Sequence, residues 1–180
     1  MIAFNTIIIL ITAYAAVFLQ SAINGFLGVQ LDLLPALMVY ASLTAGPLTI
    51  AMLALCGGLW FDSLSANPLG ISILPLLAIG FAVLVRRDLI LRDQSFAQFV
   101  IGLTASLAAP AITLIFLLTA GKAPLLGWGT VWQMLVMTFV GGAATPGFFW
   151  LFSRVAQSFD YREASTSSFR ADREIRRGRN

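Results

Sequence analysis

Asp32 and Asp62 are the only charged side chains in the first 85 positions of this sequence. Carboxylates as isolated as these can bind a cation, carry a proton or receive a basic group of a partner. The same residues can instead end or cap a helix, because a negative charge near a helix N-terminus is favoured by about 0.3–1 kcal/mol. Asp32 precedes an expected helix and Asp62 opens an expected loop, so the structural role is the favoured interpretation. Binding at an interface is the alternative.

The rest of the sequence offers little material for catalysis. It contains no His and a single Cys, Cys56, which excludes a His-based triad and an internal disulfide and argues against a thiol or imidazole metal site. No Gly-rich phosphate loop and no pair of nucleophile and base is visible. We therefore expect a protein that is not an enzyme and that holds no metal or cofactor. Nucleic-acid binding is not expected either, because the Arg excess lies in one loop and the C-terminal tail.

The composition predicts an integral membrane protein built from helices. Apolar residues make up 59% of the chain and charged residues 11%, against about 45–50% and 25% in soluble domains. A soluble domain with so few charges would expose a surface that aggregates. A bilayer imposes the opposite rule, since a charge at the centre of a spanning helix costs roughly 2.5–3.5 kcal/mol.

The apolar segments predict a bundle of six membrane-spanning helices, near residues 4–23, 34–45, 48–61, 69–85, 96–118 and 130–152. Gly46-Pro47 separates the second from the third and predicts a hairpin. A single kinked helix across this region would leave five spans, and that alternative stays open. Asn67-Pro68 is typical of an N-cap followed by a proline at the first helical position. The predicted membrane domain covers residues 1–153, followed by an Arg-rich cytoplasmic tail at 154–180.

The distribution of Lys and Arg predicts the orientation. With six spans, ten of the 11 Lys and Arg residues fall on one side, in the loop from Arg86 to Arg92 and in the tail from Arg154. Only Lys122 falls on the other side. Because positively charged loops stay in the cytoplasm, both termini are expected there. With five spans, the N-terminus would lie outside.

Small residues recur four positions apart within the expected spans, for example Gly102 with Ser106 and Ala143 with Gly147. This spacing lets helix backbones approach closely. Packing within the chain is the favoured interpretation, and a face for a partner's helix is the alternative.

The segment from Gly57 to Gly70, which reads GGLWFDSLSANPLG, resembles the signature of the rod shape-determining protein MreD family. That family shows a Gly-rich helix end, an Asp, a short polar loop and then Pro-Leu-Gly at the opening of the next span. The matching positions are Gly58, Asp62, Pro68, Leu69 and Gly70. The family's second span also resembles the segment after Asp32, although Asp32 precedes Pro35 here and the family usually has the reverse order.

This resemblance implies a non-catalytic scaffold of the bacterial cell-elongation machinery in the inner membrane, with a role in cell shape and peptidoglycan synthesis. Its implied partner is the bitopic protein MreC. Through MreC it would meet the MreB filament and the cell-wall synthases, a transpeptidase and a SEDS glycosyltransferase. The implied fold resembles the six-helix substrate-binding subunits of energy-coupling-factor transporters. The residues expected to form a partner interface or a structural loop are Gly58, Asp62, Asn67, Pro68, Gly70 and Asp32.

The alternative function is such a transporter subunit, which binds a small vitamin-like molecule from outside. It needs a polar cavity on the outer side, and the sequence supplies few polar groups there. The Ala-x-x-x-Ala pattern that these subunits often carry on the first helix is also missing, because Val17 stands four positions after Ala13. The sequence therefore favours the scaffold.

Overall fold

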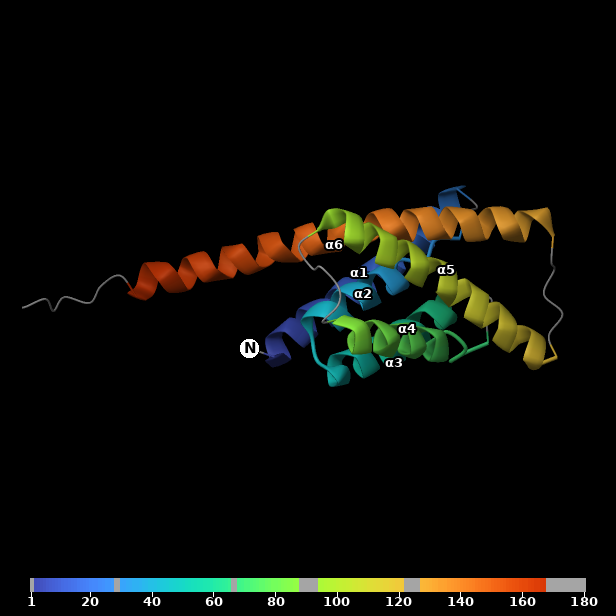
Figure 1. Ribbon diagram of the computed structural model, residues 1–180, viewed down its shortest axis with the longest axis horizontal. Helices are drawn as coiled ribbons and strands as arrows, with labels where there is room; N and C mark the ends of the chain where they lie inside the picture. Colours follow the sequence, from blue (N-terminus) through green and yellow to red (C-terminus); the bar gives the residue numbers. More distant parts are fainter. Residues whose placement is uncertain (1, 28–29, 66–67, 88–93, 122–126, 168–180) are drawn as a thin grey trace, which may run out of the picture. The chain divides into compact units, whose positions relative to one another are not determined.

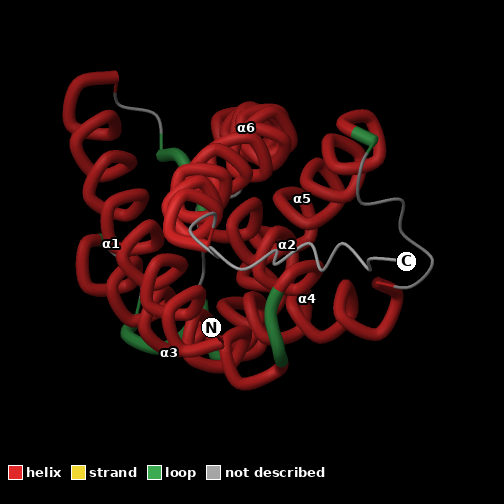
Figure 2. Tube along the Cα trace, turned by 90° about the vertical axis from the view of Figure 1, so that its left-hand side faces the viewer, coloured by secondary structure: helices red, strands yellow, loops and turns green. Residues whose placement is uncertain are grey.

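In a computed structural model of the chain, residues 2–27, 30–65, 68–87, 94–121 and 127–167 are described (Figure 1). All regular secondary structure in these ranges is helical (Figure 2), which confirms the predicted all-helical class. The helices are α1 (Ile2–Leu27), α2 (Leu34–Thr44), α3 (Pro47–Leu64), α4 (Ile73–Arg86), α5 (Ser95–Thr119) and α6 (Trp128–Ser167). The chain forms two compact units, residues 1–148 and 149–180, and each is described by itself.

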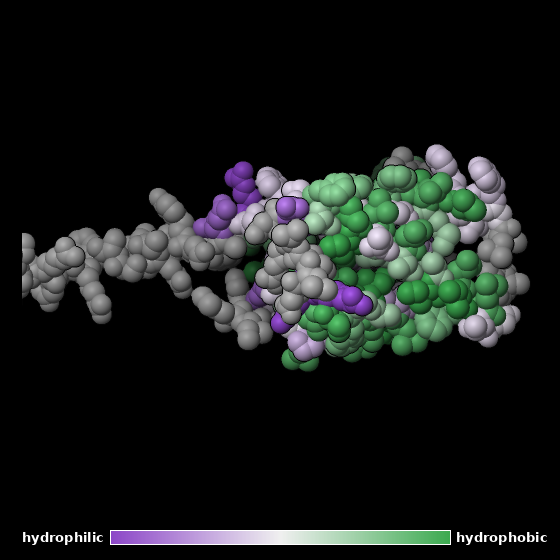
Figure 3. Space-filling model, in the orientation of Figure 1, coloured by the Kyte–Doolittle hydropathy of each residue, from purple (hydrophilic) through white to green (hydrophobic). Residues whose placement is uncertain are grey.

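Four helical segments are long and apolar enough to cross a membrane, namely Asn5–Phe26, Pro47–Leu64, Ser95–Thr119 and Trp128–Val155. The face drawn in Figure 3 is largely hydrophobic where it is described. Many large apolar side chains of the helices are exposed, as lipid-facing helices require and as soluble proteins avoid. The chain is therefore a multi-pass membrane protein. Helices α2 and α4 are shorter, with 11 and 14 residues.

Helix α2 forms the centre of the first unit. Every residue from Leu34 to Leu43 is buried, and the helix packs against α1, α3, α4 and α5. A helix that is apolar on all sides belongs in such an interior position. Pro35 lies in its first turn, where the missing N–H costs no hydrogen bond.

Helices α2 and α3 form a hairpin. Ala45 and Gly46 are both extended, with ψ of 179° and 171°, and Pro47 opens α3. Leu34, at the start of α2, lies beside Gly57 in the last third of α3, where a Cβ on Gly57 would be 3.2 Å from the Leu34 Cδ2. Only a chain that folds back can bring these two positions together. The predicted hairpin is confirmed, and the single kinked helix is wrong.

Two helices extend further than predicted. Helix α1 continues through Asn24 and Gly25 to Leu27, because the cost of Asn or Gly in a helix, up to about 1 kcal/mol, is smaller than that of interrupting backbone hydrogen bonds in an apolar setting. Helix α6 continues to Ser167, well into the predicted tail. No Gly or Pro follows Gly147 before Gly178, so nothing in the local sequence ends the helix. In the second unit, the Arg154 guanidinium lies over the Trp150 ring at 5.3 Å.

Helices α5 and α6 meet through small residues. A Cβ on Gly102 of α5 would overlap the Thr145 hydroxyl of α6, and a Cβ on Gly141 of α6 would overlap the Ser106 hydroxyl of α5. Gly102 and Ser106 therefore pack within the chain, as predicted. Gly147, by contrast, has nothing within 4 Å of its Cβ position.

Candidate functional site

Asp62 lies in the last turn of α3 and is only 2% exposed. Its Oδ2 accepts the backbone N–H of Gly70 at 2.8 Å and that of Ser72 at 3.2 Å. Its Oδ1 accepts the Ser72 hydroxyl at 2.5 Å. Hydrogen bonds to a carboxylate are about twice as strong as those between neutral groups. Asp62 therefore ties the end of α3 to the residues that lead into α4.

This anchoring explains why α4 begins later than predicted. The predicted start at Leu69 is wrong, because residues 69–72 form turns and the helix begins at Ile73. Gly70 adopts φ of +88°, a conformation that L side chains rarely take, and presents its N–H to Asp62. Pro75 consequently lies in the first turn of α4. Asn67, the predicted N-cap, lies outside the described residues.

Gly58 brings α3 against the start of α4. A Cβ at this position would lie 3.1 Å from the Ile73 nitrogen and 3.2 Å from the Ile73 Cα, so a larger residue would push the two backbones apart. Gly58, Asp62 and Gly70 thus form one structural unit, which we call the α3–α4 connection (residues 58–73). Two of the matched positions, Pro68 and Leu69, remain exposed, Leu69 to 71%.

Asp32 occupies the lead-in to α2. Its Oδ1 accepts the N–H of Leu34 at 3.0 Å, while the Gln20 Oε1 from α1 accepts the N–H of Leu33 at 2.9 Å. Both side chains thereby satisfy donors at the start of α2 that have no helical partner. Asp32 lies outside the four candidate spans, and burial raises its pKa to about 7; the Leu34 N–H opposes this shift and the nearby Asp62 charge adds to it.

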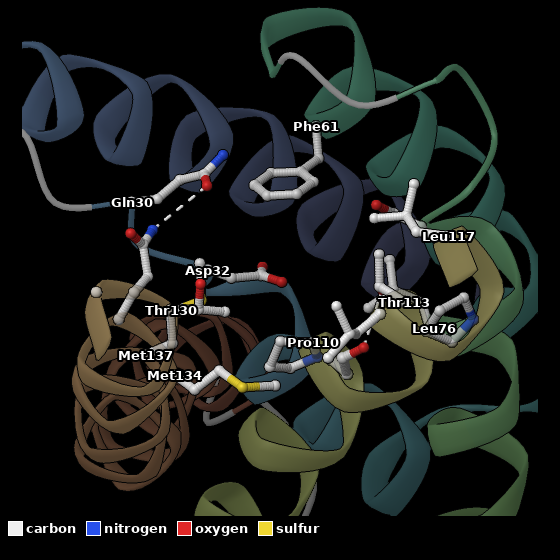
Figure 4. A pocket seen from close by; sticks show the side chains of 16 residues that line it. Gln30, Asp32, Phe61, Leu76, Pro110, Thr113, Leu117, Thr130, Met134 and Met137 are labelled. Atoms are coloured by element: carbon white, nitrogen blue, oxygen red, sulfur yellow. Dashed lines mark hydrogen bonds between the residues drawn. The ribbon is translucent and has the colours of Figure 1, made fainter. Parts of the chain in front are cut away.

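The second carboxylate oxygen of Asp32 is not used in this cap. A cavity of about 480 Å³ lies beside it, between the lead-in to α2, α4, the C-terminal half of α5 and the first turns of α6. Figure 4 shows the Asp32 carboxyl group pointing into this space, with Phe61 above it and Pro110 and Met134 below it in this view. We call it the Asp32 cavity. A volume of this size is typical of small-molecule sites.

The lining of the Asp32 cavity is mostly apolar with a few polar groups. Gln133 of α6 donates from its Nε2 to the Oε1 of Gln30 at 3.3 Å along one edge (Figure 4). Ser72, which is bonded to Asp62, also lines the cavity. Among the lining residues that the structure describes, Asp32 alone is charged.

The structure thus separates the two aspartates. The Asp62 carboxylate accepts hydrogen bonds from within the chain, whereas the Asp32 carboxylate caps a helix and also faces a cavity. Gln30 and Ser72 were not singled out from the sequence, because nothing local distinguishes them from other loop residues. Gln133 did carry a signal, as an amide within an otherwise apolar helix.

The described part of the chain contains no cluster of three or more His, Cys, Asp or Glu side chains that could hold a metal ion. The described groups that bond to the Asp32 and Asp62 carboxylates are hydrogen-bond donors, not a third acidic side chain that could complete a metal site. Comparison of the chain with protein-family models, curated proteins and solved structures gave no match.

Proposed function

We propose that this protein is a non-catalytic scaffold of the bacterial cell-elongation machinery in the inner membrane, similar to the MreD family. In this role it would bind a bitopic membrane protein like MreC and, through it, the transpeptidase, the SEDS glycosyltransferase and, indirectly, the MreB filament. It would thereby act in cell-shape regulation and peptidoglycan synthesis.

The proposal is carried by the arrangement of the α3–α4 connection. Gly58, Asp62 and Gly70, which match the family signature, tie the end of α3 to residues 70–73 through a close backbone contact and hydrogen bonds. The other two matched residues, Pro68 and Leu69, are exposed. Exposed Pro and Leu side chains next to anchored backbone suit binding to an apolar partner surface, because less conformational entropy is lost on association when a segment is already anchored.

The proposal includes six membrane crossings. Helix α2 alone would rise only about 16 Å, short of a hydrocarbon core of about 30 Å. The non-helical residues 30–33 extend it toward the outer side. Residues 30 and 32 of this segment line the Asp32 cavity. The turns at residues 69–72 extend the 14-residue α4 in the same way.

The orientation in this proposal follows from the basic residues. Arg86 ends α4, and Arg92 and the tail arginines belong to the same side of a six-span chain. Both termini are then cytoplasmic. The α3–α4 connection and the Asp32 cavity lie toward the outer side, where a bitopic partner with an external domain can reach them.

Depletion of the protein from its host tests this function. If it supports cell elongation, rod-shaped cells that lose it should become wider and round, and expression of the wild-type chain should restore the rods. A variant with Leu69→Ser should restore them poorly, whereas Leu48→Ser, at a site 73% exposed at the other end of α3, should restore them fully. Depleted cells that keep their shape would contradict the proposal.

A second candidate function is favoured by one observation, the Asp32 cavity. A substrate-binding subunit of an energy-coupling-factor transporter would need such a cavity on the outer side. Growth then distinguishes the two functions: loss of a transporter subunit would be corrected by an excess of the transported nutrient, whereas loss of a scaffold would not.

A further inference from the structure

We propose that the Asp32 cavity binds a small organic cation, an ammonium group carried on an apolar body, with the ammonium group against the Asp32 carboxylate. This site goes beyond the scaffold function and does not depend on it, because it rests only on the cavity and its lining.

Among the described residues, the charges at and next to the cavity are both negative. Asp32 points into it (Figure 4), and Asp62 lies just behind Ser72, which lines the wall and is bonded to the Asp62 carboxylate. Neither Lys nor Arg is among the described residues of the lining. Two carboxylates near a mostly apolar cavity favour a cation there and oppose an anion.

Asp32 has a free binding position. Its Oδ1 is occupied by the N–H of Leu34, while no described donor bonds to its Oδ2. Asp32 is half-buried and lines the cavity, so this oxygen is open to a ligand there. An ammonium N–H at this position would form a charge-assisted hydrogen bond. The raised pKa of Asp32 agrees with this geometry, since a cation placed here would relieve the same unfavourable charge.

The apolar lining accounts for the rest of the ligand. Leu76 and Pro75 of α4, Leu114 and Leu117 of α5 and Met134 of α6 face the cavity. A volume of about 480 Å³ accommodates a body of one or two rings. Methionine adapts to varied shapes and contacts aromatic rings favourably, and Phe61 offers a ring face near the carboxylate (Figure 4).

Gln30 and Gln133 provide a second polar contact. Their mutual hydrogen bond, from the Gln133 Nε2 to the Gln30 Oε1, leaves the Gln133 carbonyl oxygen and the Gln30 amide group available. A ligand with a hydroxyl or carbonyl group on its apolar body could bond at this edge. The cavity therefore combines one charged contact, one polar edge and an apolar wall, as small-molecule sites do.

The test uses three probes of one shape and different charge: tryptamine, its neutral alcohol analogue tryptophol, and the anion indole-3-propionate. Binding of each to the purified full chain in lipid nanodiscs is measured by equilibrium dialysis at pH 8. We expect tryptamine to bind at least tenfold more tightly than tryptophol, and indole-3-propionate to bind most weakly.

Two variants assign the binding to the cavity. Asp32→Asn keeps an oxygen for the Leu34 N–H, so the fold is retained, and it should remove the preference for tryptamine over tryptophol. Met134→Trp fills the cavity and should abolish binding of both. Both variants are checked by thermal melting before binding is measured.

Three results would overturn the proposal. One is that none of the probes binds at millimolar concentration. Another is that tryptamine and tryptophol bind equally to the wild type, which would mean that the cavity takes apolar groups such as lipid acyl chains without regard to charge. The third is a preference for tryptamine that persists in Asp32→Asn.

Discussion

Among the single residues, Asp32 and Asp62 have the same side chain but different roles, because their surroundings differ. Asp62 accepts three hydrogen bonds and is almost fully buried. Asp32 accepts one and faces a cavity with its other oxygen. The first is a structural anchor, and the second combines a helix cap with a binding position.

The structural role of Asp62 predicts a large loss of stability in Asp62→Asn. The amide nitrogen of Asn would face the N–H groups of Gly70 or Ser72, and at least one donor would lose its acceptor. We expect a loss of about 2–4 kcal/mol, since each bond to a charged group contributes about 1.5–3 kcal/mol. Thermal melting in detergent measures it, with Ser63→Ala as the control because Ser63 is exposed. Equal melting temperatures for the two variants would contradict the anchor.

The raised pKa of Asp32 predicts a pH dependence of stability. An acid whose pKa is raised from 3.8 to about 7 on folding holds its proton more tightly in the folded state. The contribution of Asp32 to the free energy of unfolding therefore falls as pH rises from about 4 to 7, and it is constant above pH 7. Among the described residues, the groups facing Asp32 are the carboxylate of Asp62, the backbone of Leu34 and the uncharged lining of the cavity.

Asp32→Asn should remove this dependence. Relative to the wild type, the variant should gain stability between pH 5 and pH 8, by up to about 3 kcal/mol, because only the two pH units from 5 to 7 contribute at about 1.4 kcal/mol per unit. Melting curves of both proteins at the two pH values measure the difference. An equal difference at both values would show that Asp32 does not titrate in this range.

At the scale of elements, the contact between α5 and α6 depends on two glycines that face hydroxyl side chains. Gly102→Ala places a methyl group against Thr145 and should cost about 1–3 kcal/mol through overpacking. Gly147→Ala is the matched control on α6, because its Cβ meets nothing within 4 Å. Thermal melting should show a loss for the first and none for the second.

A second substitution shows whether the loss arises from this contact. Thr145→Ala removes the hydroxyl that overlaps the new methyl group, so the pair Gly102→Ala with Thr145→Ala should be more stable than the sum of the two single changes predicts. Additive losses would mean that Gly102 matters for another reason.

Most element boundaries could be predicted because apolar runs and prolines mark them directly. The break at Gly46-Pro47 and the extent of α5 followed from local sequence. The late start of α4 could not be predicted from local sequence, since it depends on the Asp62 carboxylate accepting the N–H groups of Gly70 and Ser72. The Asp32 cavity could not be predicted from the sequence either, because its lining comes from five separate segments.

At the scale of the whole molecule, the six-crossing proposal predicts that both termini lie in the cytoplasm. Reporter domains that are active only in the cytoplasm, fused to either end of the chain, measure this directly. Activity of both fusions is expected. Activity of the C-terminal fusion alone would mean that α2 and α3 together do not complete two crossings.

The partners that the protein binds distinguish the scaffold from the transporter subunit. Affinity purification of the tagged full chain in mild detergent, with the bound proteins identified by mass spectrometry, reveals these partners. A scaffold should recover a single-pass membrane protein with an external domain, together with cell-wall synthases. Their yield should fall several-fold in Leu69→Ser but not in Leu48→Ser. Recovery of a small membrane subunit with a pair of ATPases would contradict the scaffold function and identify a transporter instead.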